Sequence, residues 1–195
     1  YGLRQTIADT LGVGGVFRAL RTIPVMLDFA KDMEEVCPDA WLLNYTNPMA
    51  MLTGAMLRMT SVKTVGLCHS VQVCASTLLN ELGMGYDDSV QWKIAGINHQ
   101  AWLLECTRDG VDLYPEIKRR ALLYNEGKLD IGTFEERVNM LCGDHKPDEA
   151  HLEHLRREYD LYKEKGLHGD MVRLELMRRF GYYITESSEH NSEYT

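Results

Sequence analysis

The chain has 195 residues, of which 45% are apolar and 26% are charged, so it can bury the core of one large domain or of parts of two. Its formal net charge of −8 argues against nucleic acid or an anionic membrane as a partner, and no apolar run approaches the roughly 20 residues of a membrane span. The five cysteines are scattered and odd in number, which predicts a reducing compartment, with the cytoplasm as the default.

The first part of the chain predicts helices that alternate with short strands. Residues 11–15 (LGVGG) predict a flexible turn, and the apolar spacing after them predicts a helix that Pro24 would kink. Residues 40–45 (AWLLNY) form a short apolar run that is typical of a buried strand. A second helix should follow, with Asn47 as its cap and Pro48 in its first position.

The same cycle then repeats. Residues 63–67 (KTVGL) predict a strand, and Ser70 is a candidate cap for the helix after it. This helix has the cleanest apolar face in the chain, formed by Val71, Cys74, Ala75, Leu78, Leu79 and Leu82. Strand, helix, strand and helix joined by short loops predict a parallel α/β sheet.

The pattern changes near residue 90, where we place a domain boundary between 1–89 and 90–195. Two strands are predicted, and the second runs into a turn at Asp109-Gly110. The helices expected after them lie around 114–124, around 133–142, from Asp148, and from Gly169-Asp170 to just before Gly181. The second part is therefore mixed α+β. Because the chain begins at Tyr1 without an initiator Met or a signal peptide and stops after a polar run, we expect a piece of a longer protein.

Polar groups follow three of the predicted strands, at Asn47, Cys68-His69 and Asn98-His99. Ligands of open α/β sheets bind outside the carboxyl ends of the strands. Cys68 would also precede a helix, whose positive end stabilises the thiolate that binds metals. Taken alone, a cysteine at position 68 is more often a small buried residue, and a histidine at position 99 is more often a hydrogen-bonded core residue, than a metal ligand. If both hold one metal, the site is open, because structural zinc needs four ligands and the sequence has no C-x-x-C pair.

Other polar positions are ambiguous on spacing alone. Asn47 and Asp170 are each explained equally well by helix capping, although Asp170 could also direct a carboxylate into a cleft. Residues 185–194 (TESSEHNSEY) are rich in ionisable groups but can be a solvated loop. The dinucleotide fingerprint G-x-G-x-x-G is missing, since Phe17 stands where the pattern that begins at Gly12 needs its last glycine.

Four stretches nevertheless occur in an informative order: LNYTNPMAM, VGLCHS, AGINHQAW and GDMVRLELMRRFGYYITESSEH. Together they resemble glycoside hydrolase family four, above all its α-galactosidases and their α-glucosidase and α-glucuronidase relatives. That family joins an N-terminal Rossmann domain, like that of lactate and malate dehydrogenases, to a larger α+β domain that holds the sugar. The resemblance runs essentially the whole length. It implies the C-terminal part of a Rossmann-type parallel sheet over 1–89, followed by part of the α+β domain over 90–195, both truncated.

The resemblance also implies two cofactors, NAD and a divalent metal that is usually Mn²⁺. The family's metal ligands fall on Cys68 and His99. A thiolate ligand by itself would favour zinc, iron or cobalt, so the preference for Mn²⁺ comes from the resemblance alone. Gly14 and Gly15 would approach the NAD, and the family's sugar-binding Asn falls on Asn47, which would also adjoin the cofactor.

Further roles carry over to the sugar. Family members that act on 6-phospho sugars typically have Asn or Asp after the metal Cys, so His69 implies a substrate without phosphate. Asn98 would join His69 in binding sugar hydroxyls. Asp170 aligns with an acidic residue near the reacting sugar and is assigned to acid/base work. The tyrosine base of some members has two candidates here, Tyr182 and Tyr183.

The implied activity is hydrolysis of an α-glycoside, most closely an α-galactoside, by oxidation at C3, deprotonation at C2 and elimination. The expected partners are a small sugar substrate and further copies of the chain in a dimer or tetramer. Three alternatives stay open: a 2-hydroxy-acid dehydrogenase, a regulator that binds a sugar or nucleotide without catalysis, and a metallohydrolase indifferent to NAD.

Overall fold

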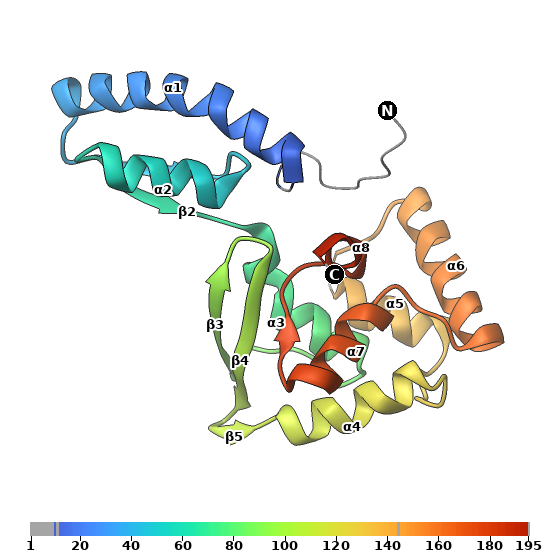
Figure 1. Cartoon of the computed structure of the whole chain (residues 1–195). Helices are drawn as coiled ribbons and strands as arrows, with labels where there is room; N and C mark the ends of the chain where they lie inside the picture. The colour runs from blue at the N-terminus through green and yellow to red at the C-terminus, as the bar shows by residue number, and fades with distance from the viewer. Residues whose placement is uncertain (1–9, 11, 144, 195) are drawn as a thin grey trace. The chain divides into compact units, whose positions relative to one another are not determined.

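The computed structural model describes residues 10, 12–143 and 145–194. It divides into two compact units, a first unit of residues Tyr1–His69 and a second unit of residues Ser70–Thr195 (Figure 1). Each unit is described by itself below.

The first unit is a strand–helix–strand repeat with one further helix. Its elements are α1 (Gly12–Val36), β1 (Trp41–Asn44), α2 (Met49–Met59) and β2 (Lys63–Gly66). The two strands pair in parallel, from Trp41 opposite Lys63 to Asn44 opposite Gly66, as the sequence predicts. A small core of Ala30, Met56 and Val62 joins α1, α2 and the start of β2. The parallel pair places the ends of both strands, and the polar residues after them, at one edge.

Two expectations for the first unit are wrong. Residues 12–15 do not form a turn but open helix α1, because packing can outweigh the weak helix propensity of glycine. Gly15 is buried there, and a β-carbon on it would lie 2.6 Å from the carbonyl carbon of Thr10. The strand β1 is not buried on both faces, since Trp41 and Leu43 are 62% and 61% exposed.

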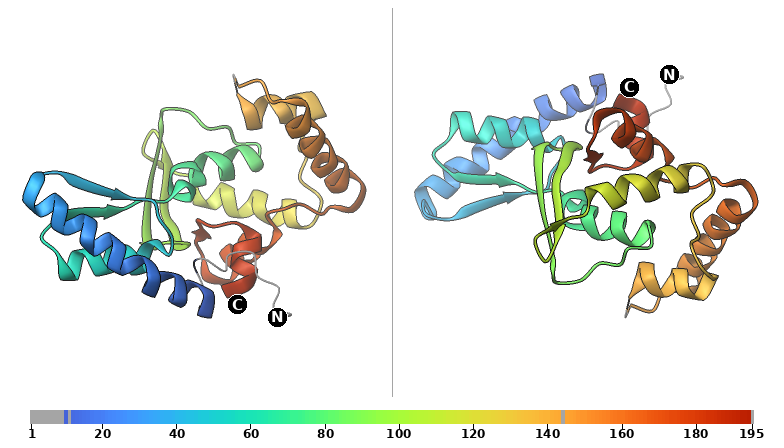
Figure 2. Two further views of the ribbon diagram at one scale, coloured as in Figure 1. Left: turned by 90° about the horizontal axis from the view of Figure 1, so that it is seen from above. Right: turned by 90° about the horizontal axis from the view of Figure 1, so that it is seen from below.

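The second unit combines an antiparallel sheet with six helices among the described residues. The chain runs through α3 (His69–Glu81), β3 (Val90–Ile97), β4 (Gln100–Arg108), β5 (Val111–Asp112), α4 (Tyr114–Asn125), α5 (Phe134–Cys142), α6 (Glu149–Lys165), α7 (Met171–Phe180), β6 (Tyr183–Ile184) and α8 (Ser188–Tyr194), with only the first residue of α3 outside the unit. In the sheet, β4 pairs with β3, β5 and β6. Helices α5 and α6 lie together at the end of the unit away from the β3–β4 hairpin (Figure 2).

The core of the second unit forms on the predicted apolar face of α3. Cys74, Leu78, Leu79 and Leu82 are buried there, together with residues of β4, α4, α7 and β6. Burial of such side chains contributes about 1.5–3 kcal/mol each to folding. The helices predicted from the sequence all form, and α7 ends at Gly181, which has the left-handed conformation of a helix C-cap.

The segment after α7 is more ordered than a solvated loop. Its residues form the short strand β6 and the helix α8, and Thr185, Glu186, Ser188 and Asn191 are buried. The solvated-loop interpretation of this segment is therefore wrong. Among the described helices, none combines the length and the apolar character that a membrane span needs.

The packing of α3 gives a testable prediction. Leu79→Ala should lower the free energy of unfolding by about 2–5 kcal/mol, because the fully buried side chain leaves a cavity. Val73→Ala on the same helix, where the side chain is 52% exposed, should change it by less than about 0.5 kcal/mol. Urea unfolding of the full-length protein measures both. Equal losses in the two variants would contradict the orientation of α3.

Candidate functional site

The edge of the first unit where β1 and β2 end carries three of the predicted site residues. Asn47 follows β1, and its side-chain carbonyl accepts a hydrogen bond from the backbone N–H of Met49 at 3.2 Å. The N-cap of α2 is Pro48, whereas the sequence predicts Asn47. Asn47 therefore supports the start of the helix from the position before the cap. Cys68 is half-buried and stands between β2 and α3, and the ring of His69 lies 4.8 Å from that of Tyr45.

His99 lies at the tip of the β3–β4 hairpin in an unusual backbone conformation. Ile97 pairs with Gln100, so the connection consists of Asn98 and His99 alone. His99 has φ of 63°, a left-handed conformation that costs an L-residue roughly 1–2 kcal/mol and that glycine adopts freely. A non-glycine residue held in this conformation is a common sign of a functional position.

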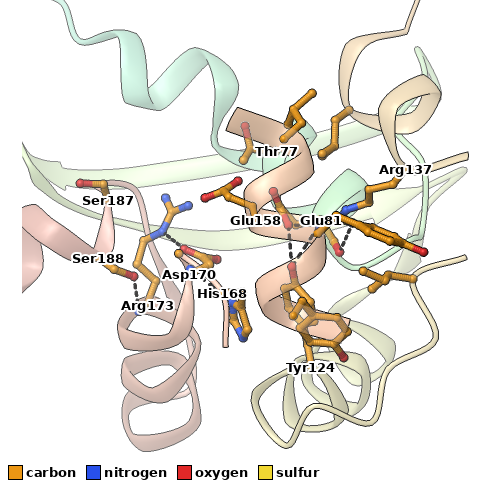
Figure 3. Close-up of a pocket in the computed structure, with 16 residues that line it drawn as sticks. Thr77, Glu81, Tyr124, Arg137, Glu158, His168, Asp170, Arg173, Ser187 and Ser188 are labelled. Atoms are coloured by element: carbon orange, nitrogen blue, oxygen red, sulfur yellow. Dashed lines mark hydrogen bonds and ion pairs between the residues drawn. The ribbon is translucent and has the colours of Figure 1, made fainter. Parts of the chain in front are cut away.

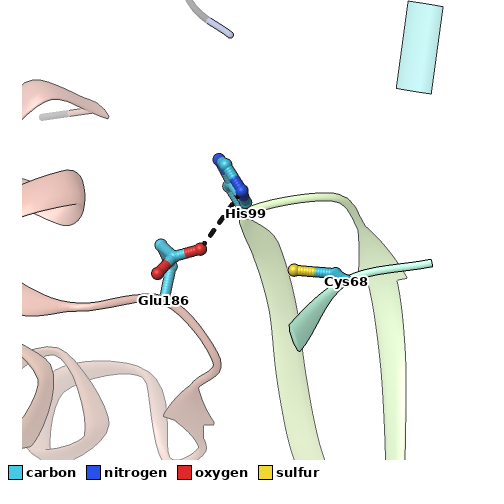
Figure 4. A group of neighbouring side chains, drawn as sticks. All are labelled: Cys68, His99 and Glu186. Atoms are coloured by element: carbon cyan, nitrogen blue, oxygen red, sulfur yellow. Dashed lines mark ion pairs between the residues drawn. The ribbon is translucent and has the colours of Figure 1, made fainter. Parts of the chain in front are cut away.

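The imidazole of His99 meets a buried carboxylate. Its Nε2 atom lies 3.3 Å from Oε2 of Glu186, and the two side chains are only 11% and 10% exposed (Figure 4). The hydroxyl of Ser70 donates a hydrogen bond to Oε2 of Glu186 at 2.9 Å, and the backbone N–H of Ser187 donates to Oε1 at 3.0 Å. The prediction that Ser70 caps α3 is therefore wrong. Ser70 lies inside the helix, and its hydroxyl binds Glu186.

A second histidine adjoins this pair. The rings of His99 and His190 meet edge to face with their centroids 5.4 Å apart. Nδ1 of His190 lies 2.7 Å from the hydroxyl oxygen of Ser187. One group in the second unit thus contains two imidazoles, a carboxylate and two hydroxyls, which are groups that bind metals and sugar hydroxyls.

Asp170 is buried at the start of α7, where it forms an ion pair with Arg173 and accepts a hydrogen bond from the hydroxyl of Tyr183 at 2.7 Å. Burial raises the pKa of the Asp170 carboxyl, and the positive charge of Arg173 and the Tyr183 hydrogen bond oppose this only in part. A carboxyl with a raised pKa can donate a proton at higher pH than an ordinary aspartate.

The two tyrosine candidates differ sharply in exposure. Tyr183 is fully buried, and burial raises the pKa of its phenol well above the ordinary value. Its hydroxyl binds Asp170, so it positions that carboxylate and does not suit a base that contacts a sugar. Tyr182 is 45% exposed and lies edge to face with Tyr114.

Asp170 lines a cavity of about 180 Å³ in the second unit (Figure 3). Its lining includes the polar side chains of Arg137, His168, Arg173, Ser187 and Ser188. Because Ser187 both lines the cavity and donates to Glu186, the cavity adjoins the His99–Glu186 pair. The structure therefore brings two separately predicted residues, Asp170 and His99, to neighbouring positions of one unit.

His168 in this cavity is neutral at pH 7. Its Nδ1 atom accepts a hydrogen bond from the backbone N–H of Asp170 at 3.2 Å, which an imidazolium could not do. Its ring stacks on Tyr124 with centroids 3.8 Å apart. Burial, with a smaller contribution from the charge of Arg137, lowers the pKa of His168 to about 4.

Sequence reasoning missed Glu186 and His190 as members of the site. Both lie in a segment that was recognised as rich in ionisable groups, but nothing in its spacing connects it to His99. Ser70 and Glu186 are separated by 116 positions in the chain. The useful signal was the apolar stretch Gly181–Ile184, which carries the polar residues after it into the core.

Comparison with known proteins matches both parts of the chain to one enzyme family. The model described as family 4 glycosyl hydrolase matches residues 1–84, and that of the family 4 glycosyl hydrolase C-terminal domain matches residues 94–195. An α-galactosidase from Bacillus subtilis (strain 168) is 58% identical over 194 residues, which cover 100% of this chain and 36% of the relative. An α-galactosidase from Rhizobium meliloti (strain 1021) is 36% identical over 196 residues, covering 100% of this chain and 32% of the relative.

A solved 6-phospho-α-glucosidase from gut microorganisms, in complex with NAD and Mn²⁺, is similar in fold. The TM-score is 0.60 at 21% sequence identity, and the match covers 95% of this chain and 36% of the other. This likeness confirms the predicted fold class, a Rossmann-type parallel sheet followed by an α+β part. The chain spans about a third of the length of the curated relatives it matches.

The backbone of His99 gives a prediction that is independent of activity. Without metal, His99→Gly should be more stable than His99→Ala by about 1 kcal/mol or more, because only the alanine keeps the left-handed strain. Both variants lose the imidazole, so their difference isolates the backbone. Urea unfolding of the metal-free full-length protein gives the comparison, and an alanine variant as stable as the glycine variant would refute the strained tip.

The state of His168 predicts how stability depends on pH. The unfolded chain binds a proton at His168 near pH 6.5, whereas the folded chain does so only near pH 4. The free energy of unfolding should therefore fall as the pH drops from about 6.5 towards 4.

His168→Asn should reduce this fall, while His154→Asn should leave it unchanged, because the side chain of His154 is 58% exposed. Denaturant unfolding at a series of pH values measures the slope for each protein. A slope unaltered by His168→Asn would show that His168 is not held neutral.

Proposed function

The chain belongs to family 4 of the glycosyl hydrolases, and on this premise we propose that the whole protein is an α-galactosidase that requires NAD and Mn²⁺. The observation that carries the substrate is the 58% identity with the α-galactosidase of Bacillus subtilis along the entire chain. His69 supports a substrate without a phosphate group, by the family pattern at the position after the metal cysteine. The proposed enzyme acts on small sugars in the cytoplasm as a dimer or tetramer.

Cys68 and His99 are the proposed metal ligands. Cys68 stands two residues before Ser70, and consecutive Cα atoms are about 3.8 Å apart, so its Cα lies within roughly 7.6 Å of that of Ser70. Ser70 binds Glu186, which in turn pairs with His99. The connectivity of the chain therefore supports a thiolate close to the imidazole of His99. A thiolate and an imidazole both fit a transition metal and leave positions open for substrate.

The first unit supplies the features that suit NAD. Its parallel strands end at one edge, as in sheets that bind nucleotides, and Asn47 follows the first of them. Gly14 and Gly15 lie in the first turn of α1, where backbone N–H groups and the helix dipole favour phosphate. We propose that residues 1–89 belong to the NAD-binding domain and residues 90–195 to the sugar- and metal-binding domain.

When bound, NAD⁺ supplies reversible hydride removal at C3 of the sugar, and Mn²⁺ stabilises negative charge on the sugar oxygens. The side chains of Asn47, His69 and Asn98 orient the sugar hydroxyls. A ketone at C3 would make the proton on C2 acidic enough for a protein base to remove, and the glycosidic oxygen would leave as it gains a proton. Asp170, with its raised pKa, is the proposed donor of that proton.

The proposal is tested with the full-length protein and aryl α-galactoside, α-glucoside and α-glucuronide, each assayed with and without NAD⁺ and Mn²⁺ under reducing conditions. Release of the aglycone should require both cofactors and be fastest with the galactoside. In D₂O, deuterium should appear at C2 of the product, because C2 is deprotonated during the reaction.

Each alternative predicts a different outcome. Cleavage that is indifferent to NAD⁺ would replace the mechanism with that of a metallohydrolase. Accumulation of NADH without cleavage would identify a dehydrogenase. Binding of sugar or NAD⁺ without turnover would identify a regulator, and faster cleavage of a 6-phospho-α-glucoside would overturn the assignment of the substrate.

A further inference from the structure

The second unit contains three carboxylates that are largely buried, and one of them differs from the others. Glu81 forms an ion pair with Arg137, and Asp170 forms one with Arg173. Glu186 is 7% exposed, and among the described residues no lysine or arginine forms an ion pair with it. Its charged partner is His99, which is positive only when protonated. A buried carboxylate without a permanent cation is unfavourable unless a cation is supplied.

We propose that Glu186 is a third protein ligand of the metal and binds it directly beside His99. That a metal site exists here rests on the proposed function. The role of Glu186 in that site is argued from its contacts within the second unit. Both residues offer atoms that coordinate metals, and both side chains are almost buried.

The spacing of the two donor atoms fits one ion. Metal–nitrogen and metal–oxygen bonds to transition metals are about 2.0–2.2 Å long. Two such ligands at angles between 90° and the tetrahedral value are therefore about 2.8–3.6 Å apart. Nε2 of His99 and Oε2 of Glu186 lie 3.3 Å apart. A charge-assisted hydrogen bond between the same groups would be about 2.7–2.9 Å long.

The hydrogen bonds to Glu186 leave room for a metal. Ser70 donates to one carboxylate oxygen and Ser187 to the other, so each oxygen keeps a further lone pair. These two bonds fix the orientation of the carboxylate in the protein itself. The donors come from a helix and from the backbone, so the position of the carboxylate does not depend on His99.

A carboxylate ligand also accounts for the choice of metal. A thiolate and an imidazole favour zinc, iron or cobalt, whereas carboxylate oxygen suits Mn²⁺. With Glu186 in the site, two negative ligands and one neutral ligand would face the ion, and the oxygen would raise the relative affinity for Mn²⁺.

The first test measures binding of Mn²⁺ to the metal-free full-length protein by electron paramagnetic resonance of the unbound ion. Glu186→Gln should weaken Mn²⁺ binding at least tenfold and weaken Co²⁺ binding less, because the amide oxygen is a poorer ligand for a hard cation. Glu189→Gln, a change of an exposed carboxylate on α8, should leave both affinities unchanged. Equal Mn²⁺ affinity in the Glu186→Gln variant and the wild type would overturn the proposal.

A second variant separates a direct ligand from a residue that only orients His99, since loss of an orienting partner can also weaken metal binding 10- to 100-fold. Glu186→His offers an imidazole nitrogen at a similar reach from the backbone, in place of the carboxylate oxygen. With Co²⁺ bound, this variant should keep the thiolate-to-cobalt charge-transfer band, whose proposed source is Cys68, and should show shifted d–d absorption bands, because a nitrogen ligand replaces an oxygen ligand. Wild-type d–d bands in a folded variant that retains Co²⁺ would show that position 186 does not bind the metal.

The wild type and Cys68→Ser distinguish failure of this proposal from failure of the proposed function. If the wild type binds neither Mn²⁺ nor Co²⁺, the metal site itself is wrong. If it binds Co²⁺ with a band that Cys68→Ser abolishes, the site stands, and the Glu186 variants alone decide the third ligand. Circular dichroism of each metal-free variant establishes that it is folded.

Discussion

Burial of the apolar face of α3 is the constraint on which the candidate site depends. Leu78, Leu79 and Leu82 hold the helix against β4, α4 and α7, and this fixes the position of its first turn. Ser70 in that turn binds Glu186, and the residue before the helix is Cys68. The strand β4, which packs on the same core, begins directly after His99. An ordinary hydrophobic contact thus sets the position of the polar groups at the end of the helix.

The sequence was sufficient for the parts of the fold that depend on local pattern. The period of apolar residues located α3, and turn residues located the Asp109–Gly110 hairpin and the end of α7. The same reasoning failed at Gly14 and Gly15, which lie inside helix α1 although glycine has a weak helix propensity. At Gly15 there is no room for a side chain, because a β-carbon would lie 2.6 Å from the carbonyl carbon of Thr10. The prediction that Ser70 caps α3 also failed, because the residue that its hydroxyl binds, Glu186, lies 116 positions further along the chain.

The candidate site was predictable only one residue at a time. Burial in the core or helix capping could explain Cys68, His99 and Asp170 from the sequence alone. Only the resemblance of the surrounding motifs to a known family identified these three residues as candidates. Glu186 had no such support, because its contacts with Ser70 and His99 come from distant segments. The polar side chains of the site therefore depend on tertiary structure in a way that the apolar faces do not.

The left-handed tip of the β3–β4 hairpin has a consequence for how the protein can change by mutation. Besides glycine, the residues that tolerate this backbone best are asparagine, aspartate and histidine. A histidine codon becomes an asparagine or aspartate codon by a change of its first base. Each of these two steps would keep the hairpin while replacing a nitrogen donor with an oxygen donor. The geometry of the tip therefore favours single-base changes at position 99 that keep the hairpin and alter the kind of atom that this position offers to a ligand.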